Sequence, residues 1–332
     1  MQSFIRLGLA AAGLASAIIC STACYAAPNA GPLPRTLLYV STLDWGTGTG
    51  SVFVYDAYGK NPQPINSVSI SSGFPDGVWT DKEGRVYVAV VNSQSYPLGY
   101  IDVYTPDLRK VVRQYTQGIS GPSGGTFDRS GNLYVANLCS RSAFSCFVFA
   151  RTRNPMSSTS GYVGIYPRGS STPSEYLQGP INIAVGVALD STDDVFVVNN
   201  TGGVAWDVVE FPSHSTLGFV VPFLGVPSQR WVGAATFDPS DALVASVNSA
   251  IDFFPNKRGK PARTLTKGVV AADGLAYGPD GTLFAGNFEF EQNEGNTLAF
   301  PPGSDTPTRT YAVPYNNGVI SIAIGPSSSL TH

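Results

Sequence analysis

The chain has 332 residues, with 20 Lys or Arg against 23 Asp or Glu and a formal net charge of −3 at pH 7. A slightly acidic chain predicts no nucleic-acid partner, because binding to a phosphate backbone needs clustered basic residues. Charged residues make up only 13% of the chain, whereas Gly, Pro, Tyr and Phe are abundant, which indicates an all-β protein rich in turns.

The N-terminus has the features of a secretory signal peptide. Arg6 precedes an apolar run from Leu7 to about Cys20, and small residues follow to Ala27. The apolar run is too short to span a bilayer. We therefore expect residues 1–27 to be a signal peptide and residues 28–332 to form a single domain.

Export predicts a secreted or periplasmic location. A cut before Cys24 would instead make a lipid-anchored protein. Ser21, three residues earlier, is polar where lipoprotein signals usually carry Leu, which disfavours the anchor. No later segment has about 18 consecutive apolar residues, so we expect no transmembrane segment.

A repeat organises the rest of the chain. Each copy has a small residue, a short apolar stretch, a turn with Asp or Gly, and a run such as Val-Ala-Asn. Successive copies begin 40 to 62 residues apart, a period typical of β-propeller blades. Five complete copies begin at Gly77, Gly124, Gly186, Ala234 and Gly274, and a sixth begins at Ser321.

Each copy predicts a four-stranded antiparallel blade. The repeat core is a hairpin in which an Asp caps the turn, at 81, 128, 190 and 238, and a Gly at 84, 131 or 281 supplies a positive φ. An edge-like segment follows a third strand that ends in an aromatic residue and usually Pro. The third strands are Tyr100–Pro106, Tyr162–Pro167, Val208–Pro212, Ile251–Pro255 and Asn296–Pro301.

The two ends of the repeat region complete one blade together. Leu37–Ser41, Ser51–Asp56 and Ile65–Ile70 are second, third and fourth strands without a first. Ser321–Ile324 is a first strand without partners. Pairing the two closes the ring without a free edge. The sequence therefore predicts a six-bladed β-propeller closed by its N- and C-terminal strands.

The repeat resembles that of NHL-repeat propellers. The pattern D-x-x-G-x-[LV]-[YF]-V-A-[ND] is carried in full by Asp128–Asn137, and the likeness covers essentially all of residues 28–332. This resemblance implies a six-bladed fold. It implies no single function, because such propellers include lactonases, lyases and binding scaffolds.

The segment PDGVWTDKEGRVYVA, which contains Asp76, is similar to gluconolactonase-like enzymes. In that family a metal-binding Asp precedes Gly, which maps onto Asp76 and less clearly onto Asp273. The family also uses a Glu and two Asn at the equivalent starts of other blades, so three of the four expected ligands are missing. The equivalent residues here are Ser123, Val185, Gly233 and Ile320.

Polar and aromatic residues gather on one predicted face, where first strands begin and second strands end. Carboxylate and amide oxygens converging on the axis would suit Ca²⁺, with Asp76 and Asp273 as the metal ligands. Capping of local backbone groups is the alternative for the Asn and Asp residues. Loop tryptophans could stack on a ligand or pack between blades, whereas Trp79 lies within an inner strand and is expected in the core. The candidate ligand-binding residues are Asp76, Asp273, Asn137, Asn199, Asn287, Trp45, Trp231 and Arg230.

Cysteine and histidine positions limit other chemistry. Cys139 and Cys146 are close together in a Ser-rich loop of an exported protein, which favours a local disulfide. A metal pair is the alternative, but no His is nearby. His214, on an outer-rim loop, and His332, at the terminus, cannot supply a general base at the axis.

Two functions fit these features. The first is a secreted propeller that binds a small molecule, a glycan or a partner protein on this face. The alternative is a divalent-metal-dependent hydrolase or lactonase of the six-bladed type. A bound divalent cation at the axis would distinguish them.

Overall fold

The computed structural model describes residues 36–44, 46–92, 99–138, 161–202, 205–223, 232–289, 294–314 and 318–326. All of them belong to one compact unit, Pro32–His332. The predicted signal peptide and Cys24 lie outside these ranges. Within them, no helix could span a membrane.

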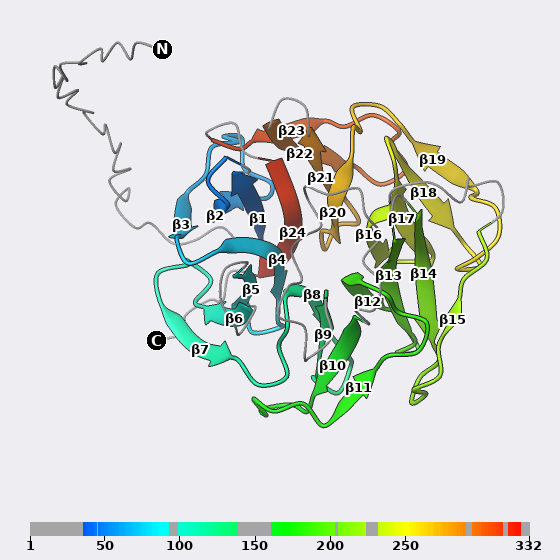
Figure 1. Cartoon of the computed structure of the whole chain (residues 1–332). Helices are drawn as coiled ribbons and strands as arrows, with labels where there is room; N and C mark the ends of the chain where they lie inside the picture. The colour runs from blue at the N-terminus through cyan, green and yellow to red at the C-terminus, as the bar shows by residue number, and fades with distance from the viewer. Residues whose placement is uncertain are drawn as a thin grey trace, which may run out of the picture. The chain divides into compact units, whose positions relative to one another are not determined.

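The described strands form six antiparallel four-stranded sheets arranged as a ring (Figure 1). In each sheet the first strand of the blade lies nearest the axis and the fourth lies outermost (Figure 1). The prediction of an all-β, six-bladed propeller is confirmed. One blade contains β4 (Phe74–Thr80), β5 (Val86–Val91), β6 (Gly99–Tyr104) and β7 (Val111–Tyr115). The second contains β8 (Pro122–Phe127), β9 (Leu133–Asn137), β10 (Tyr162–Tyr166) and β11 (Glu175–Leu177). The third contains β12 (Ala184–Leu189), β13 (Val195–Gly202), β14 (Ala205–Phe211) and β15 (Phe219–Val220). The fourth contains β16 (Val232–Phe237), β17 (Leu243–Val247), β18 (Ala250–Phe254) and β19 (Arg263–Leu265). The fifth contains β20 (Ala272–Tyr277), β21 (Leu283–Glu289), β22 (Glu294–Phe300) and β23 (Arg309–Ala312).

The sixth blade joins the two ends of the propeller. It has the order β24-β1-β2-β3, with β1 (Thr36–Asp44), β2 (Thr49–Asp56), β3 (Asn66–Ile70) and β24 (Gly318–Pro326). Leu37 pairs with Gly325 and Ser41 with Ser321, so the expected pairing of the terminal strands is confirmed. In Figure 1 the red C-terminal strand lies beside the dark blue β1.

The hairpin turns between first and second strands follow the predicted chemistry. In each of four turns an Asp carboxylate accepts the backbone N–H of the residue four positions later, at 2.8–2.9 Å. These residues are Asp81, Asp128, Asp190 and Asp238. Gly84, Gly131 and Gly281 have φ of 79°, 85° and 83°, a conformation that favours glycine.

Every inner strand has a β-bulge near its start. The pairing skips one residue between Pro75 and Gly77, and it skips one residue in four of the other blades. In β16 it skips two, Gly233 and Ala234. A bulge leaves a residue outside the ladder and re-aims its side chain. We call the six bulge positions the mouth ring: Asp76, Ser123, Val185, Gly233, Asp273 and Ile320.

The small residue after each bulge lets neighbouring blades meet backbone to backbone. A Cβ on Gly77 would lie 2.4 Å from the carbonyl oxygen of Ser123, and a Cβ on Gly274 would lie 2.6 Å from the nitrogen of Ile322. The Ser321 hydroxyl accepts the N–H of Val78 at 3.2 Å. The six mouth-ring residues therefore lie at one level around the axis.

We predict that Gly77→Ala destabilises the protein whereas Gly186→Ala does not. Both glycines follow a bulge, but a Cβ at 186 would meet only the Val198 side chain at 3.8 Å. Overpacking at 77 should lower the free energy of unfolding by roughly 1–3 kcal/mol. Urea denaturation of both variants measures this. Equal midpoints would show that the neighbouring blades can move apart to accommodate a Cβ at residue 77, and would contradict the prediction.

Candidate functional site

Asp76 is the most unusual residue of the mouth ring. It is the bulge residue of β4 and is only partly exposed. Among the described residues its carboxylate has no hydrogen-bond partner, and burial raises its pKa to about 7. The bulge sets Asp76 outside the hydrogen-bonded ladder near the start of an innermost strand, and burial there disfavours the charged form of its carboxylate.

Asp273 is the second acidic residue of the mouth ring. It is the bulge residue of β20 and is also partly exposed. Unlike Asp76, it has an interaction of its own. The blade of β24 lies between the two, so Asp76, Ile320 and Asp273 occupy three successive ring positions (Figure 1).

The other mouth-ring positions offer little to a metal ion. The Ser123 hydroxyl is buried and donates to the carbonyl oxygen of Ala184 at 2.8 Å. Val185 and Ile320 have aliphatic side chains and Gly233 has none. Ile320 packs against an apolar cluster formed by Leu43, Phe74 and Val91. Throughout the described ranges, no three His, Cys, Asp or Glu residues are grouped as metal ligands.

Three asparagines in the C-terminal halves of second strands hold the loops that precede the first strands of their blades. Asn137, Asn199 and Asn287 are almost fully buried. The side-chain oxygen of each accepts a backbone N–H from the residue 17 positions earlier, at distances of 2.8 to 3.2 Å. Their amide oxygens are thus engaged by backbone groups, as the capping alternative expects. The three donors are Ser120, Asn182 and Val270.

Several candidate residues fall outside the described part of the chain. Trp45, Arg230 and Trp231 are among them, as are Cys139 and Cys146. Trp79 is described and lies in the core, where its ring stacks on Tyr87 with centroids 5.7 Å apart.

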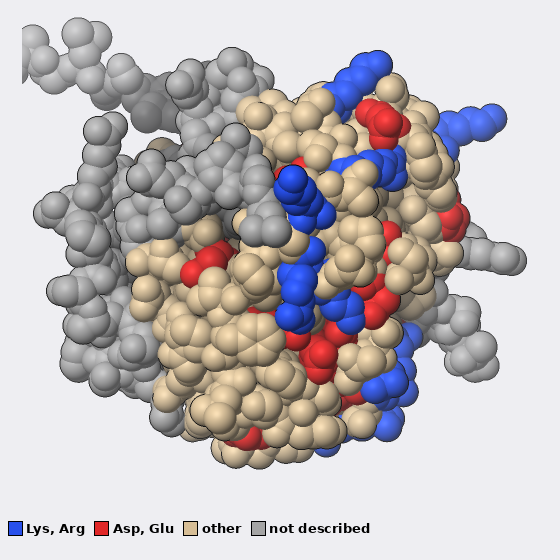
Figure 2. All heavy atoms as spheres, turned by 90° about the vertical axis from the view of Figure 1, so that its right-hand side faces the viewer, with Lys and Arg blue, Asp and Glu red and all other residues tan. Residues whose placement is uncertain are grey.

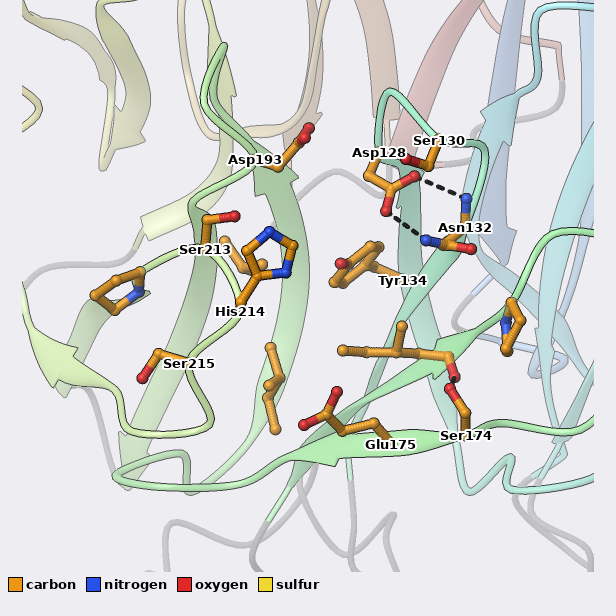
Figure 3. Close-up of a pocket in the computed structure, with 15 residues that line it drawn as sticks. Asp128, Ser130, Asn132, Tyr134, Ser174, Glu175, Asp193, Ser213, His214 and Ser215 are labelled. Atoms are coloured by element: carbon orange, nitrogen blue, oxygen red, sulfur yellow. Dashed lines mark hydrogen bonds between the residues drawn. The ribbon is translucent and has the colours of Figure 1, made fainter.

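A pocket that the sequence did not indicate lies on the outer rim (Figure 3). It has a volume of about 240 Å³ and lies between the blades of β8–β11 and β12–β15. The turns after first and third strands line it, so it opens on the face opposite to the mouth ring. His214, predicted on the rim, projects into it together with Tyr134 and Glu175.

The rim pocket is acidic, but two of its carboxylates have partners. Asp128 accepts hydrogen bonds from the backbone and side chain of Asn132, at 2.8 and 2.7 Å (Figure 3). Asp193 pairs with Arg129 at 2.9 Å. Burial and the nearby carboxylates raise the pKa of Tyr134 to about 12. The pocket arises where turns of two blades meet, and no local motif encodes such a meeting.

Basic side chains on the flank shown in Figure 2 are interspersed with acidic ones. Lys257 bonds to Asp190 and lies 2.7 Å from Asp241, and the guanidinium of Arg258 lies 3.1 Å from Glu210. The pairs with Asp190 and Glu210 join β18–β19 turn residues to the neighbouring blade, whereas Asp241 belongs to the same blade as Lys257. They hold blades together and leave no uniform basic surface on this flank.

No family model matches the sequence, and no curated protein is similar to it in sequence. Solved structures of low sequence identity share the fold. A chain of the nidogen/laminin complex superposes with a TM-score of 0.58 at 12% identity, covering 88% of this chain and 99% of its own. A protein of unknown function from Bacteroides caccae gives 0.60 at 11%, covering 87% and 98%.

An enzyme is also among the similar structures. The luciferin-regenerating enzyme superposes with a TM-score of 0.51 at 13% identity, covering 75% of this chain and 83% of its own. A binding complex and an enzyme thus share this architecture, so the likeness establishes the propeller fold alone.

Proposed function

We propose that this chain is an exported propeller that binds a ligand at the mouth ring and is a binding protein rather than an enzyme. The observation that carries the proposal is Asp76, a desolvated carboxylate without a hydrogen-bond partner in the described part of the chain. Such a group destabilises the fold, because burial of an unpaired charge is unfavourable. Residues of this kind persist where function needs them.

The composition of the mouth ring favours binding over metal-dependent hydrolysis. Ca²⁺ takes six to eight oxygen ligands. Only Asp76 and Asp273 offer carboxylates, Ser123 already donates to a backbone carbonyl, and the remaining ring positions lack polar side-chain atoms. The alternative, a divalent-metal-dependent hydrolase or lactonase of NHL-like type, draws support from the axial Asp76 and from the enzyme of similar fold.

A fragment screen tests whether the mouth ring binds small molecules. Ligand-observed NMR on the wild type and on Asp76→Asn should give compounds whose binding depends on residue 76. If no fragment distinguishes the two proteins, the mouth ring is not a binding site.

Metal analysis and lactone hydrolysis address the alternative. We expect no stoichiometric divalent metal, no change in melting temperature with CaCl₂ or EDTA, and no lactone hydrolysis above background. Calcium-dependent turnover that Asp76→Asn abolishes would establish the hydrolase and overturn the binding assignment.

For the exported protein, we predict that Cys139 and Cys146 form a disulfide. The closed loop is short, so the bond should stabilise the protein by about 2–3 kcal/mol. Thiol labelling of unfolded, unreduced protein should find no free thiol, and prior reduction should release two. Two labelled thiols without reduction would contradict the bond.

A further inference from the structure

We infer that the ligand of the mouth ring is an organic monocation: a protonated amine attached to an apolar body, with its ammonium group bound by Asp76. This inference rests on the proposed function and names its ligand class. It follows from the residue types at the six mouth-ring positions and from the hydrogen bonds that their side chains already make.

The charge of the ligand follows from Asp76. The Asp76 carboxylate accepts no hydrogen bond within the described ranges, so its negative charge has no partner there, whereas Asp273 has an interaction of its own. An ammonium group carries one positive charge and three N–H donors. A charge-assisted hydrogen bond to Asp76 would compensate its desolvation.

The shortage of oxygen atoms argues against a metal ion or a sugar. A calcium ion needs a shell of oxygen ligands, and a sugar needs donors and acceptors for several hydroxyls. Ser123 is committed to Ala184, and the described ring offers no further hydroxyl or amide side chain. The engaged oxygens of Asn137, Asn199 and Asn287 do not supply the missing contacts.

The apolar part of the ligand follows from the neighbours of Asp76. Ile320 occupies the next ring position and extends the apolar cluster that contains Phe74 of the same strand as Asp76. Val185 and Gly233 complete an apolar arc on the other side of the ring. An apolar body would cover these surfaces while the ammonium group reaches Asp76.

The test uses benzylamine as the probe and benzyl alcohol as its neutral counterpart. Binding to the full chain is measured by ligand-observed NMR and calorimetry at pH 8, where Asp76 is ionised, with CaCl₂ and glucose as further probes. Wild type is compared with Asp76→Asn, Asp273→Asn and, as a matched control, Glu175→Gln. The last variant removes an exposed carboxylate from the rim pocket on the opposite face. Cooperative melting of each variant establishes that it is folded.

We expect benzylamine to bind the wild type and Glu175→Gln equally, and Asp76→Asn about tenfold to a hundredfold more weakly, the effect of losing a hydrogen bond to a charged group. Asp273→Asn should have the smaller effect. Equal binding of benzyl alcohol, or Asp76-dependent binding of only CaCl₂ or glucose, would overturn the ligand class and leave the mouth ring as a binding site. Loss of benzylamine binding in Glu175→Gln would move the amine site to the rim pocket. If Asp76→Asn changes the binding of no probe and of no fragment, the proposed function fails as well.

Discussion

Deletion of residues 318–332 should abolish cooperative folding. The deletion removes β24, which pairs with β1 from Thr36 opposite Pro326 to Leu43 opposite Gly318. It also removes the buried side chains of Val319 and Ile322. The truncated chain would leave the inner edge of β1 unpaired and two neighbouring blades uncovered. We expect exposed strand edges to produce aggregates, seen by light scattering, and loss of a single melting transition.

A shorter deletion is the matched control for this experiment. Removing residues 327–332 keeps all of β24 and its pairs with β1. The shorter variant should melt like the wild type. If the longer deletion also melts cooperatively and stays monomeric, terminal strand pairing is not what holds the ring closed.

The blades and their closure could be predicted from the sequence because each blade repeats the same local chemistry. The Asp-capped turn at Asp128 needs only residues up to Asn132, and the same short pattern recurs at Asp81, Asp190 and Asp238. The pairing of Ser321–Ile324 with Leu37–Ser41 followed from counting strands, because an incomplete first blade and an incomplete last blade complement each other.

The roles of the mouth residues could not be predicted as fully. Asn137, Asn199 and Asn287 stand in the same Val-Ala-Asn-like pattern whether their amides cap a loop or bind a ligand. Their partners lie 17 residues earlier, in loops whose course the pattern does not fix. The bulges are likewise invisible in the residue pattern, although the six equivalent positions were aligned correctly by the repeat. It is the bulge that separates Asp76 from the hydrogen-bonded ladder.

The carboxylate of Asp76 should make the protein less stable as the pH rises. Its pKa in the folded protein is about 7, above the ordinary value of 3.8. Between these two values the folded state binds more protons at this site than the unfolded state does. Its contribution to the free energy of unfolding therefore falls as the pH rises from about 4, and levels off above about 7.

Replacing Asp76 by Asn removes this pH dependence. At pH 4 the variant and the wild type should be about equally stable. At pH 8 the variant should be more stable by up to roughly 4 kcal/mol, at about 1.4 kcal/mol per pKa unit. Urea denaturation at pH 4, 6 and 8 measures the difference, and Glu175→Gln controls for the loss of one negative charge. If Asp76→Asn is instead less stable than the wild type at pH 8, the carboxylate has a structural role in the bulge. Stabilisation that grows between pH 4 and pH 7 and then levels off would mean that the fold retains an unfavourable charge at this position, as a site kept for a cationic ligand requires.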